Sequence, residues 1–229
     1  MLVEKEETGS TNDDARALAL VGAPAGTAVL ARRQTHGRGR AGRAFASPEG
    51  GMYLSVVLRP LLAPAQWGLL SLAAALDVAL ALRATGFPVD VKWPNDLLLG
   101  GRKVGGILAE ARVDRDGFVV VGIGLNLERA PEDVPGATAL AAHAPPPDAR
   151  ALATRIAEAL VARVAALERD GPEATLAGLR ATCATLGRKV SWEKGEGVAV
   201  DVAEDGALVV QDKEGRRHRV LAGDVVIRP

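Results

Sequence analysis

The segment THGRGRAGRAF, from Thr35 to Phe45, interleaves three glycines with three arginines and contains no acidic residue. Glycine lets the backbone change shape, and arginine guanidinium groups bind phosphate or carboxylate groups through paired hydrogen bonds. We therefore predict a loop that closes over an anionic ligand and excludes water from it. On this segment alone, a solvated surface loop and an RGG-like RNA-binding segment are the alternatives.

The same glycines also satisfy the spacing G-x-G-x-x-G of dinucleotide-binding proteins, at Gly37, Gly39 and Gly42, after a predicted strand. That motif requires a helix that opens inside it, because the helix N-terminus holds the pyrophosphate. The continuation AFASPEGG, residues 44–51, does not have a helical pattern. The chain also lacks a G-x-x-x-x-G-K-[ST] segment, so we expect neither of these nucleotide-binding folds.

Composition narrows the class of protein. The 229 residues contain 28 basic and 28 acidic side chains, and only 3% are aromatic. Proteins that bind nucleic acid nonspecifically usually carry a basic excess or stacking aromatics. The balanced charge and few aromatics therefore argue against a nonspecific nucleic-acid-binding protein. The single cysteine, Cys183, excludes an internal disulfide, and its apolar helical surroundings predict a buried, inert thiol.

The sequence offers no signal for export or membrane insertion. The acidic start MLVEKEETGS has no long apolar run, and no apolar stretch reaches the length of about 18 residues that spans a bilayer. We expect a soluble, cytoplasmic protein without a membrane partner.

Hydrophobic periodicity predicts an α+β chain. Acids at Asp13 and Asp14 suit the first turn of a helix that follows Ser10 or Thr11, and Gly100-Gly101 and Asp116-Gly117 suit hairpin turns. After residue 186, five short β-rich runs separated by glycine turns, the last at Gly223-Asp224, fit a small barrel. The predicted domains are 1–184 and 185–229. Predicted strands are 2–7, 27–33, 52–59, 89–93, 96–99, 104–112 and 118–127, and predicted helices are near 11–20, 64–85, 148–169 and 172–184.

A second group of polar residues lies in KWPND, residues 92–96, which ends one predicted strand and starts the next. Pro94 forces a turn, after which Asn95 and Asp96 present oxygen ligands suited to Mg²⁺ or to an attacking amine. Lys103 lies between two glycine pairs, so the atoms of another molecule can approach the backbone there. An ordinary turn and a solvated lysine are the alternatives.

The segment GIGLN, residues 122–126, combines small residues with one amide on a strand that is otherwise rich in β-branched side chains. Such a surface fits a planar heterocycle lying against the sheet. A strand with a bulge is the alternative.

Together, GRGRAGR at 37–43, KWPND at 92–96, RKVGGIL at 102–108 and GIGLN at 122–126 resemble biotin–protein ligases in order and spacing. The resemblance extends to GSTN at 9–12 and to the β-rich end of the chain, so it covers almost the whole sequence. It implies a mixed β-sheet flanked by helices, the class II synthetase-like catalytic fold of biotin and lipoyl ligases, followed by an SH3-like β-barrel. We expect the chain to begin at the catalytic core, without the DNA-binding repressor domain of some members.

The resemblance also implies the reaction. Biotin and Mg-ATP would form biotinyl-5′-AMP, and the biotinyl group would pass to a lysine of the biotin carboxyl carrier protein domain of acetyl-CoA carboxylase. The resemblance further implies a homodimer formed through the core sheet. It implies no binding of DNA. A lipoate-type ligase is the nearest alternative, and a non-catalytic RNA-binding protein is an alternative of a different class.

Site residues are carried over from the resemblance. Lys103, Arg40 and Asp96 would be catalytic, with Asp96 also a Mg²⁺ ligand, whereas His36 matches no role and Trp93 fits a core or pocket wall. Phe45 stands where relatives often have tryptophan. The expected biotin-binding residues are Ser10, Thr11, Asn12, Gln34, Gly37, Arg38, Gly39, Lys103 and Gly106, and the expected ATP-binding residues are Arg38, Arg40, Arg43, Phe45, Asn95 and Asn126.

Overall fold

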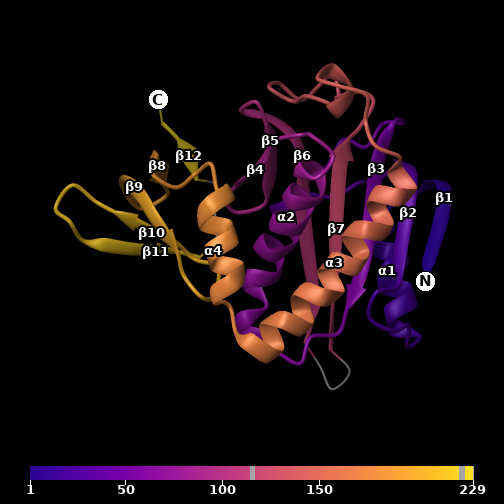
Figure 1. Ribbon diagram of the computed structural model, residues 1–229, viewed down its shortest axis with the longest axis horizontal. Coiled ribbons are helices and arrows are strands. Elements are labelled where there is room, and N and C mark those ends of the chain that lie inside the picture. Colours follow the sequence, from indigo (N-terminus) through magenta and orange to yellow (C-terminus); the bar gives the residue numbers. More distant parts are fainter. Residues whose placement is uncertain (114–116, 222–224, 229) are drawn as a thin grey trace.

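The computed structural model describes residues 1–113, 117–221 and 225–228 (Figure 1). A seven-stranded sheet has the strand order β1-β2-β3-β7-β6-β5-β4. The β1–β2 pair is parallel and the other neighbouring pairs are antiparallel, so the predicted mixed sheet is confirmed. Its strands are β1 (Leu2–Thr8), β2 (Ala28–Gln34), β3 (Gly51–Leu58), β4 (Val89–Lys92), β5 (Asp96–Leu99), β6 (Arg102–Arg112) and β7 (Phe118–Asn126).

Helices cover both faces of this sheet. Because successive side chains on a strand point to opposite faces, Val29, Val57 and Val120 pack on one face against Ala15 and Ala19 of α1. The alternate strand residues face the main core, which α2 and α3 cover on the other side (Figure 1). The helices are α1 (Thr11–Leu20), α2 (Gly68–Arg83), α3 (Ala149–Asp170) and α4 (Glu173–Thr182).

The predicted elements differ from the observed ones mainly at their ends. The long helix predicted from residue 64 is divided, because Pro64–Gln66 forms a separate 3₁₀ turn before α2 begins at Gly68. Gly100 and Gly101 have φ values of 58° and 76° and join β5 to β6 in a tight hairpin, as predicted. The predicted turns at 116–117 and 223–224 include residues outside those described.

The end of the chain forms a second, antiparallel sheet with the strand order β11-β10-β9-β8-β12. The five predicted strands are confirmed, but the described pairings do not join β11 to β12, so closure into an SH3-like barrel stays a prediction. The strands are β8 (Lys189–Trp192), β9 (Gly195–Val202), β10 (Leu208–Gln211), β11 (Arg217–Val220) and β12 (Val226–Ile227).

Trp93 ties this second sheet to the first. Its side chain is 1% exposed, and its indole Nε1–H donates to the carbonyl oxygen of Gly206 at 2.9 Å. Its backbone N–H donates to Oγ1 of Thr185 at 2.9 Å. The interpretation of Trp93 as a core residue is confirmed, and so is that of Cys183 as a buried thiol. Within the described residues, no helix combines the length and apolar character needed to cross a lipid bilayer.

One buried ion pair joins α2 to α3. Two guanidinium nitrogens of Arg163 donate to Oδ1 of Asp77, at 2.6 and 3.1 Å, and the Asp77 side chain is only 4% exposed. Among the described residues, Oδ2 of Asp77 has no hydrogen-bond partner. Burial raises the pKa of Asp77 and the hydrogen bonds from Arg163 oppose that shift, so the carboxylate depends on its one cation.

We expect Arg163→Met to lower the free energy of unfolding by about 3–5 kcal/mol, because it leaves a buried charge without a partner. Adding Asp77→Asn to that variant removes the charge and should recover at least half of the loss. Denaturant unfolding measures both variants. Equal stability of the single and double variants would show that the charge of Asp77 is not the cause.

Candidate active site

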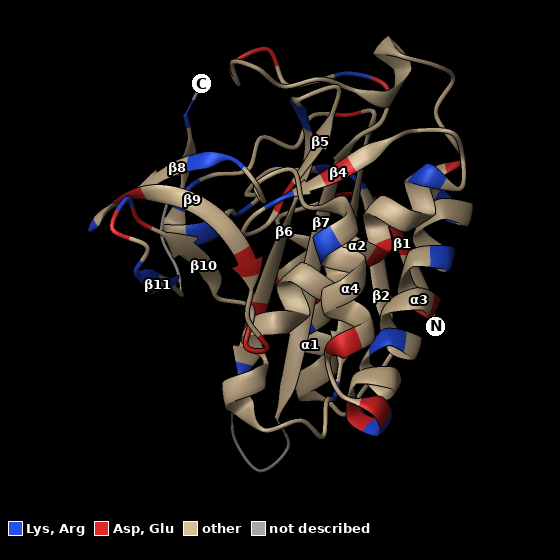
Figure 2. Cartoon of the chain, turned by 60° about the vertical axis from the view of Figure 1, so that its left-hand side comes forward, with Lys and Arg blue, Asp and Glu red and all other residues tan. Residues whose placement is uncertain are grey.

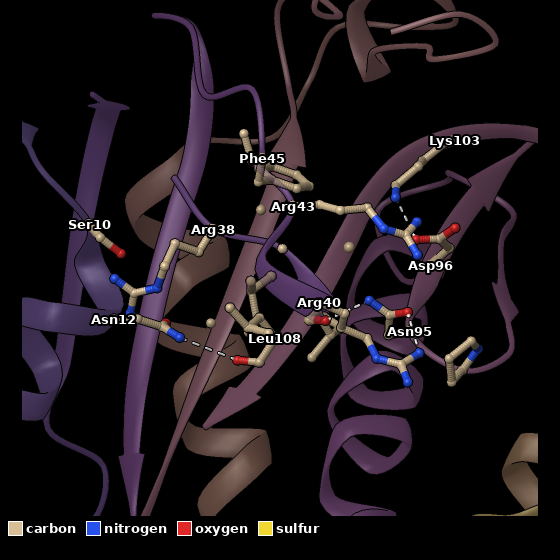
Figure 3. A pocket seen from close by; sticks show the side chains of 18 of the residues that line it. Ser10, Asn12, Arg38, Arg40, Arg43, Phe45, Asn95, Asp96, Lys103 and Leu108 are labelled. Carbon is tan, nitrogen blue, oxygen red and sulfur yellow. Dashed lines mark hydrogen bonds and ion pairs between the residues drawn. The ribbon is translucent and has the colours of Figure 1, made fainter. Parts of the chain in front are cut away.

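A cavity of about 190 Å³ lies beside the N-terminus of α1, on the same sheet face as that helix (Figure 3). Its floor is the part of β6 and β7 that carries no side chains, because Gly106, Gly122 and Gly124 occur there. The arginine–glycine loop, the KWPND turn and Val225 of the C-terminal region complete its walls. The segments that the sequence analysis singled out therefore meet at one place.

The two glycines of β7 leave room for the chain's own side chains. A Cβ atom at Gly122 would collide with the amide of Asn12, and one at Gly124 would collide with the ring of Phe45. The Phe45 ring also lies within van der Waals reach of Gly106. The planar group that lies against this part of the sheet is therefore Phe45, where the sequence suggested a bound heterocycle.

The arginine–glycine loop forms a compact turn. Arg38 and Ala44 form an isolated β-bridge around the 3₁₀ turn Arg40–Gly42. The segment from residue 43 to β3 contains no helix. The absence of a dinucleotide-binding helix agrees with the expectation. Gly37 closes the base of the loop, where a Cβ atom would collide with Oγ of Ser47 and the carbonyl oxygen of Phe45.

On the opposite wall, Lys103 and Asp96 form an ion pair with an Nζ–Oδ1 distance of 2.5 Å (Figure 3). Asp96 begins β5 and Lys103 lies on the adjacent β6, so the hairpin brings the two side chains together. Asn95 donates from Nδ2 to the carbonyl oxygen of Ile107 at 2.8 Å and accepts at Oδ1 from Nη1 of Arg40 at 3.3 Å. The KWPND turn is thus anchored to β6 on one side and to the loop on the other.

Polar groups from α1 and β2 form the near wall. Oε1 of Gln34 accepts from both the backbone N–H and the hydroxyl of Thr11, at 2.9 and 3.1 Å. The side chain of Ser10, the residue before the helix, makes no capping hydrogen bond, although it is 4% exposed. The Ser10 hydroxyl therefore does not cap α1.

Arg38 lies between two carboxylates. Its Nη1 donates to Oδ2 of Asp13 at 2.6 Å, and its Nη2 donates to Oε2 of Glu110 at 3.0 Å. The hydrogen bond to Asp13, aided by that to Glu110, raises the pKa of Arg38 above its ordinary value. The guanidinium is therefore permanently charged and already paired in this state of the protein.

Two of the expected binding residues do not line the cavity. Gly37 lies at the base of the loop outside the cavity lining, and Asn126 is buried, with Nδ2 donating to the carbonyl oxygen of Thr138 at 2.9 Å. His36, which matches no role in the resemblance, is exposed. The expected residues that line the cavity are Ser10, Thr11, Asn12, Gln34, Arg38, Gly39, Arg40, Arg43, Phe45, Asn95, Asp96, Lys103 and Gly106.

Known proteins are similar to this chain in sequence and in fold. The profile of the Biotin/lipoate A/B protein ligase family matches residues 7–126, and that of the Biotin protein ligase C terminal domain matches residues 185–228. The biotin–[acetyl-CoA-carboxylase] ligase of Mycobacterium tuberculosis is 41% identical over 96% of this chain and 86% of its own length. The chain belongs to the biotin protein ligase family.

Solved structures of biotin protein ligases have the same fold. The structure from Aquifex aeolicus in complex with biotin and ATP is 30% identical, has a TM-score of 0.82, and covers 99% of this chain and 98% of its own. The bifunctional ligase/repressor of Bacillus subtilis is 42% identical, but the match spans 58% of this chain and only 42% of that protein.

Sequence reasoning missed two residues that bond to the near wall of the cavity without lining it, Ser55 and Glu110. Ser55 is 0% exposed on β3, and its hydroxyl lies 2.7 Å from Oγ1 of Thr11 and 2.6 Å from Oδ1 of Asn12. Glu110 accepts from Nδ2 of Asn12 at 2.6 Å. A hydroxyl inside an apolar strand, and an acid two residues after Leu108 on the same strand face, were the signals available in the sequence.

We expect Gly124→Ala to displace the Phe45 ring from the sheet of this ligase, because the added Cβ atom would occupy the ring's position. The free energy of unfolding should change by about 1 kcal/mol or less, since the ring lies on a loop that can move. Tryptic cleavage after Arg40 and Arg43, mapped by mass spectrometry, should become faster. In a Phe45→Ala background the added Gly124→Ala change should leave the cleavage rate the same as in Phe45→Ala alone. If Gly124→Ala speeds cleavage equally with and without the ring, the ring is not involved.

Proposed function

We propose that this ligase activates biotin with ATP and transfers it to a lysine of a biotin carboxyl carrier protein domain of acetyl-CoA carboxylase. In the first step a biotin carboxylate oxygen attacks the α-phosphorus of ATP, and the α–β phosphoanhydride bond breaks to release pyrophosphate. In the second step the lysine amine attacks the acyl carbon of biotinyl-5′-AMP, and AMP leaves with the bonding electrons.

The observation that carries this proposal is the convergence of four separated segments on one cavity. Cations from the loop and from β6 face a wall of hydroxyl and amide groups at the start of α1. A neutral cyclic urea requires such uncharged donors and acceptors, whereas a carboxylate and a phosphate require cations. The dithiolane ring of lipoate has no N–H or carbonyl group to hydrogen-bond with these hydroxyl and amide groups. The polar wall therefore favours biotin over the lipoate-type alternative.

Lys103 would act between the two anions that must meet. Its charge would offset repulsion between the biotin carboxylate and the α-phosphate, and it would stabilise the charge that develops on the phosphoryl oxygens. Asp96 holds the ammonium at 2.5 Å, so the cation is positioned before substrate arrives. Arg40 would cover the adenylate from the loop, and Arg43 and Phe45 would form the adenine wall.

Asp96 and Asn95 fit a Mg²⁺ ion that arrives with the nucleotide. Magnesium commonly uses one or two carboxylates together with substrate phosphates and water, and does not need an all-protein cage. Among the described residues, no group of three His, Cys, Asp or Glu side chains could form such a cage. A bound Mg²⁺ would neutralise phosphate charge and orient pyrophosphate for departure.

Charge distribution opposes the RNA-binding alternative. Basic and acidic residues are interspersed along α3 and the C-terminal strands (Figure 2). Arg38 is paired with Asp13 and Glu110, and Arg40 donates to Asn95 in the cavity wall. The homodimer, the absence of DNA binding, the barrel closure and the cytoplasmic location stay predictions.

Incubation of the protein with α-labelled ATP and Mg²⁺, together with biotin, lipoate or octanoate, tests the proposal directly. We expect an acid-labile AMP adduct with biotin and much less with the other two acids. A preference for lipoate or octanoate would overturn the substrate assignment, and the absence of any adduct would overturn the reaction.

We expect Lys103→Ala to fold normally and to form biotinyl-5′-AMP at least about a hundredfold more slowly, because a positioned cation contributes about 3 kcal/mol to such a transition state. Lys103 is 37% exposed, so its truncation opens no core cavity. Pyrophosphate release is the measurement, and Lys194→Ala on the exposed C-terminal hairpin is the matched control. Wild-type rates of release in the Lys103 variant would contradict this role.

We expect Arg40→Gly to make the adenylate but to release it early. Loss of a charge-assisted hydrogen-bonded pair costs about 1.5–3 kcal/mol, or about ten- to a hundredfold in residence time. Escaped adenylate acylates exposed lysines, so biotin incorporation into serum albumin without a carrier domain measures the escape. Arg129→Gly, on an exposed loop, is the control; if both variants label albumin equally, Arg40 does not retain the intermediate.

A further inference from the structure

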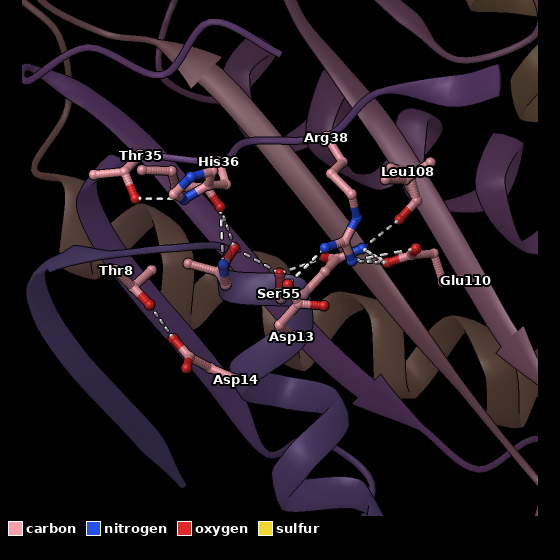
Figure 4. A network of polar contacts seen from close by, with 12 residues as sticks. Thr8, Asp13, Asp14, Thr35, His36, Arg38, Ser55, Leu108 and Glu110 are labelled. Atoms are coloured by element: carbon pink, nitrogen blue, oxygen red, sulfur yellow. Dashed lines mark hydrogen bonds and ion pairs between the residues drawn. The ribbon is translucent and has the colours of Figure 1, made fainter. Parts of the chain in front are cut away.

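We propose that Glu110 is a positioning residue for the biotin half of the site, and that Arg38 is the latch through which Glu110 and Asp13 hold the arginine–glycine loop closed. In this assignment Arg38 does not bind phosphate. The proposal rests on the proposed function for its substrate, and on the polar network of Figure 4 for its geometry.

Glu110 is the shared acceptor of that network. Its Oε2 accepts from Nδ2 of Asn12 at 2.6 Å and from Nη2 of Arg38 at 3.0 Å, and its Oε1 lies 3.3 Å from the same Nη2. One carboxylate on β6 therefore binds a residue of α1 and a residue of the loop (Figure 4). These two partners lie 98 and 72 positions away in the sequence.

The charge of Glu110 determines how the amide of Asn12 is oriented. An ionised carboxylate only accepts hydrogen bonds, so it selects the NH₂ end of the amide. Oδ1 of Asn12 is then directed at the hydroxyl of Ser55, 2.6 Å away and inside the sheet. Gly122 makes this approach possible, because a Cβ atom there would collide with the amide.

Glu110 thereby controls a chain of polar groups that reaches the rest of the near wall. Ser55 lies between Asn12 and Thr11, and Thr11 donates to Oε1 of Gln34. Gln34 in turn donates from Nε2 to Oγ of Ser47, at the far end of the loop. The groups proposed to bind the ureido ring are therefore oriented from one end by a single charged residue.

Arg38 has the electrostatic surroundings of a latch. Two carboxylates, from Asp13 and Glu110, face one guanidinium, so this cluster has a net charge of −1. A phosphate brought to Arg38 would meet both carboxylates within a few ångströms, where like charges repel. Asp13 thus has a tertiary role in addition to its place in the first turn of α1.

The latch acts on the loop because Arg38 is its first bridged residue. Arg38 and Ala44 form the β-bridge that closes the loop, and the backbone N–H of Gly39 donates to the carbonyl oxygen of Arg43 at 2.7 Å. Holding the Arg38 side chain to β6 and α1 therefore holds the whole turn over the cavity. Loosening it should affect biotin binding and loop protection together.

The first test is Glu110→Gln in the full chain, which preserves size but removes the charge. We expect the KM for biotin to rise at least about tenfold, with kcat and the KM for ATP within threefold of wild type. Tryptic cleavage after Arg40 and Arg43 should become at least threefold faster in the absence of ligand. Glu158→Gln, on the exposed face of α3, is the matched control and should change none of these values.

A second variant separates a latch from a simple loss of structure. Adding Asn12→Asp to Glu110→Gln returns one carboxylate beside Arg38 and places an amide donor opposite it, and should restore at least half of the lost protection against trypsin. Thermal unfolding of each variant is measured alongside. Failure of the double variant to regain protection, at an unchanged unfolding midpoint, would overturn the latch.

Arg38→Gln distinguishes the latch from a phosphate clamp. A latch predicts a higher KM for biotin and faster cleavage after Arg40 and Arg43, with the KM for ATP within threefold of wild type. A rise of more than tenfold in the KM for ATP, with the KM for biotin unchanged, would overturn the proposal. If the wild type formed no adenylate from biotin, the proposed function would fail, while the cleavage rates would still decide whether the latch exists.

Discussion

The site depends on the absence of side chains from one face of β6 and β7. Gly106, Gly122 and Gly124 leave a bare area of sheet beside the start of α1. Into this area fit the ring of Phe45 from the loop and the amide of Asn12 from the helix. Any Cβ atom at the two β7 glycines would push one of these groups away. The loop and the helix can meet over the sheet only because the strand beneath them has no side chains there.

Charged groups of the site occur in pairs of opposite sign drawn from different elements. Lys103 on β6 pairs with Asp96 on β5, and Arg38 on the loop pairs with Asp13 on α1 and Glu110 on β6. Pairing lowers the cost of gathering cations in a partly buried space. It also holds each cation in one position, which is what electrostatic stabilisation of a transition state requires. A chain with no net charge can in this way hold cations in fixed positions beside one small ligand.

The C-terminal sheet contributes to the site through its contacts with the KWPND turn. Trp93 donates hydrogen bonds to Thr185, which precedes β8, and to Gly206, in the turn between β9 and β10. Val225 also reaches the cavity wall. The positions of Asn95 and Asp96 therefore depend on both parts of the chain.

The sequence by itself determined the kinds of elements, their order and the segments that form the site, because hydrophobic periodicity, glycine turns and short motifs are local properties. Tertiary structure alone decided which group fills the space above Gly124, that the Asn126 amide bonds to Thr138 and does not line the cavity, and that Glu110 and Ser55 orient the near wall. These outcomes depend on contacts between residues far apart in the chain, such as the 98 positions that separate Asn12 from Glu110. Only the folded sheet brings such residues within hydrogen-bonding distance, and no local pattern records the direction in which a polar side chain then points.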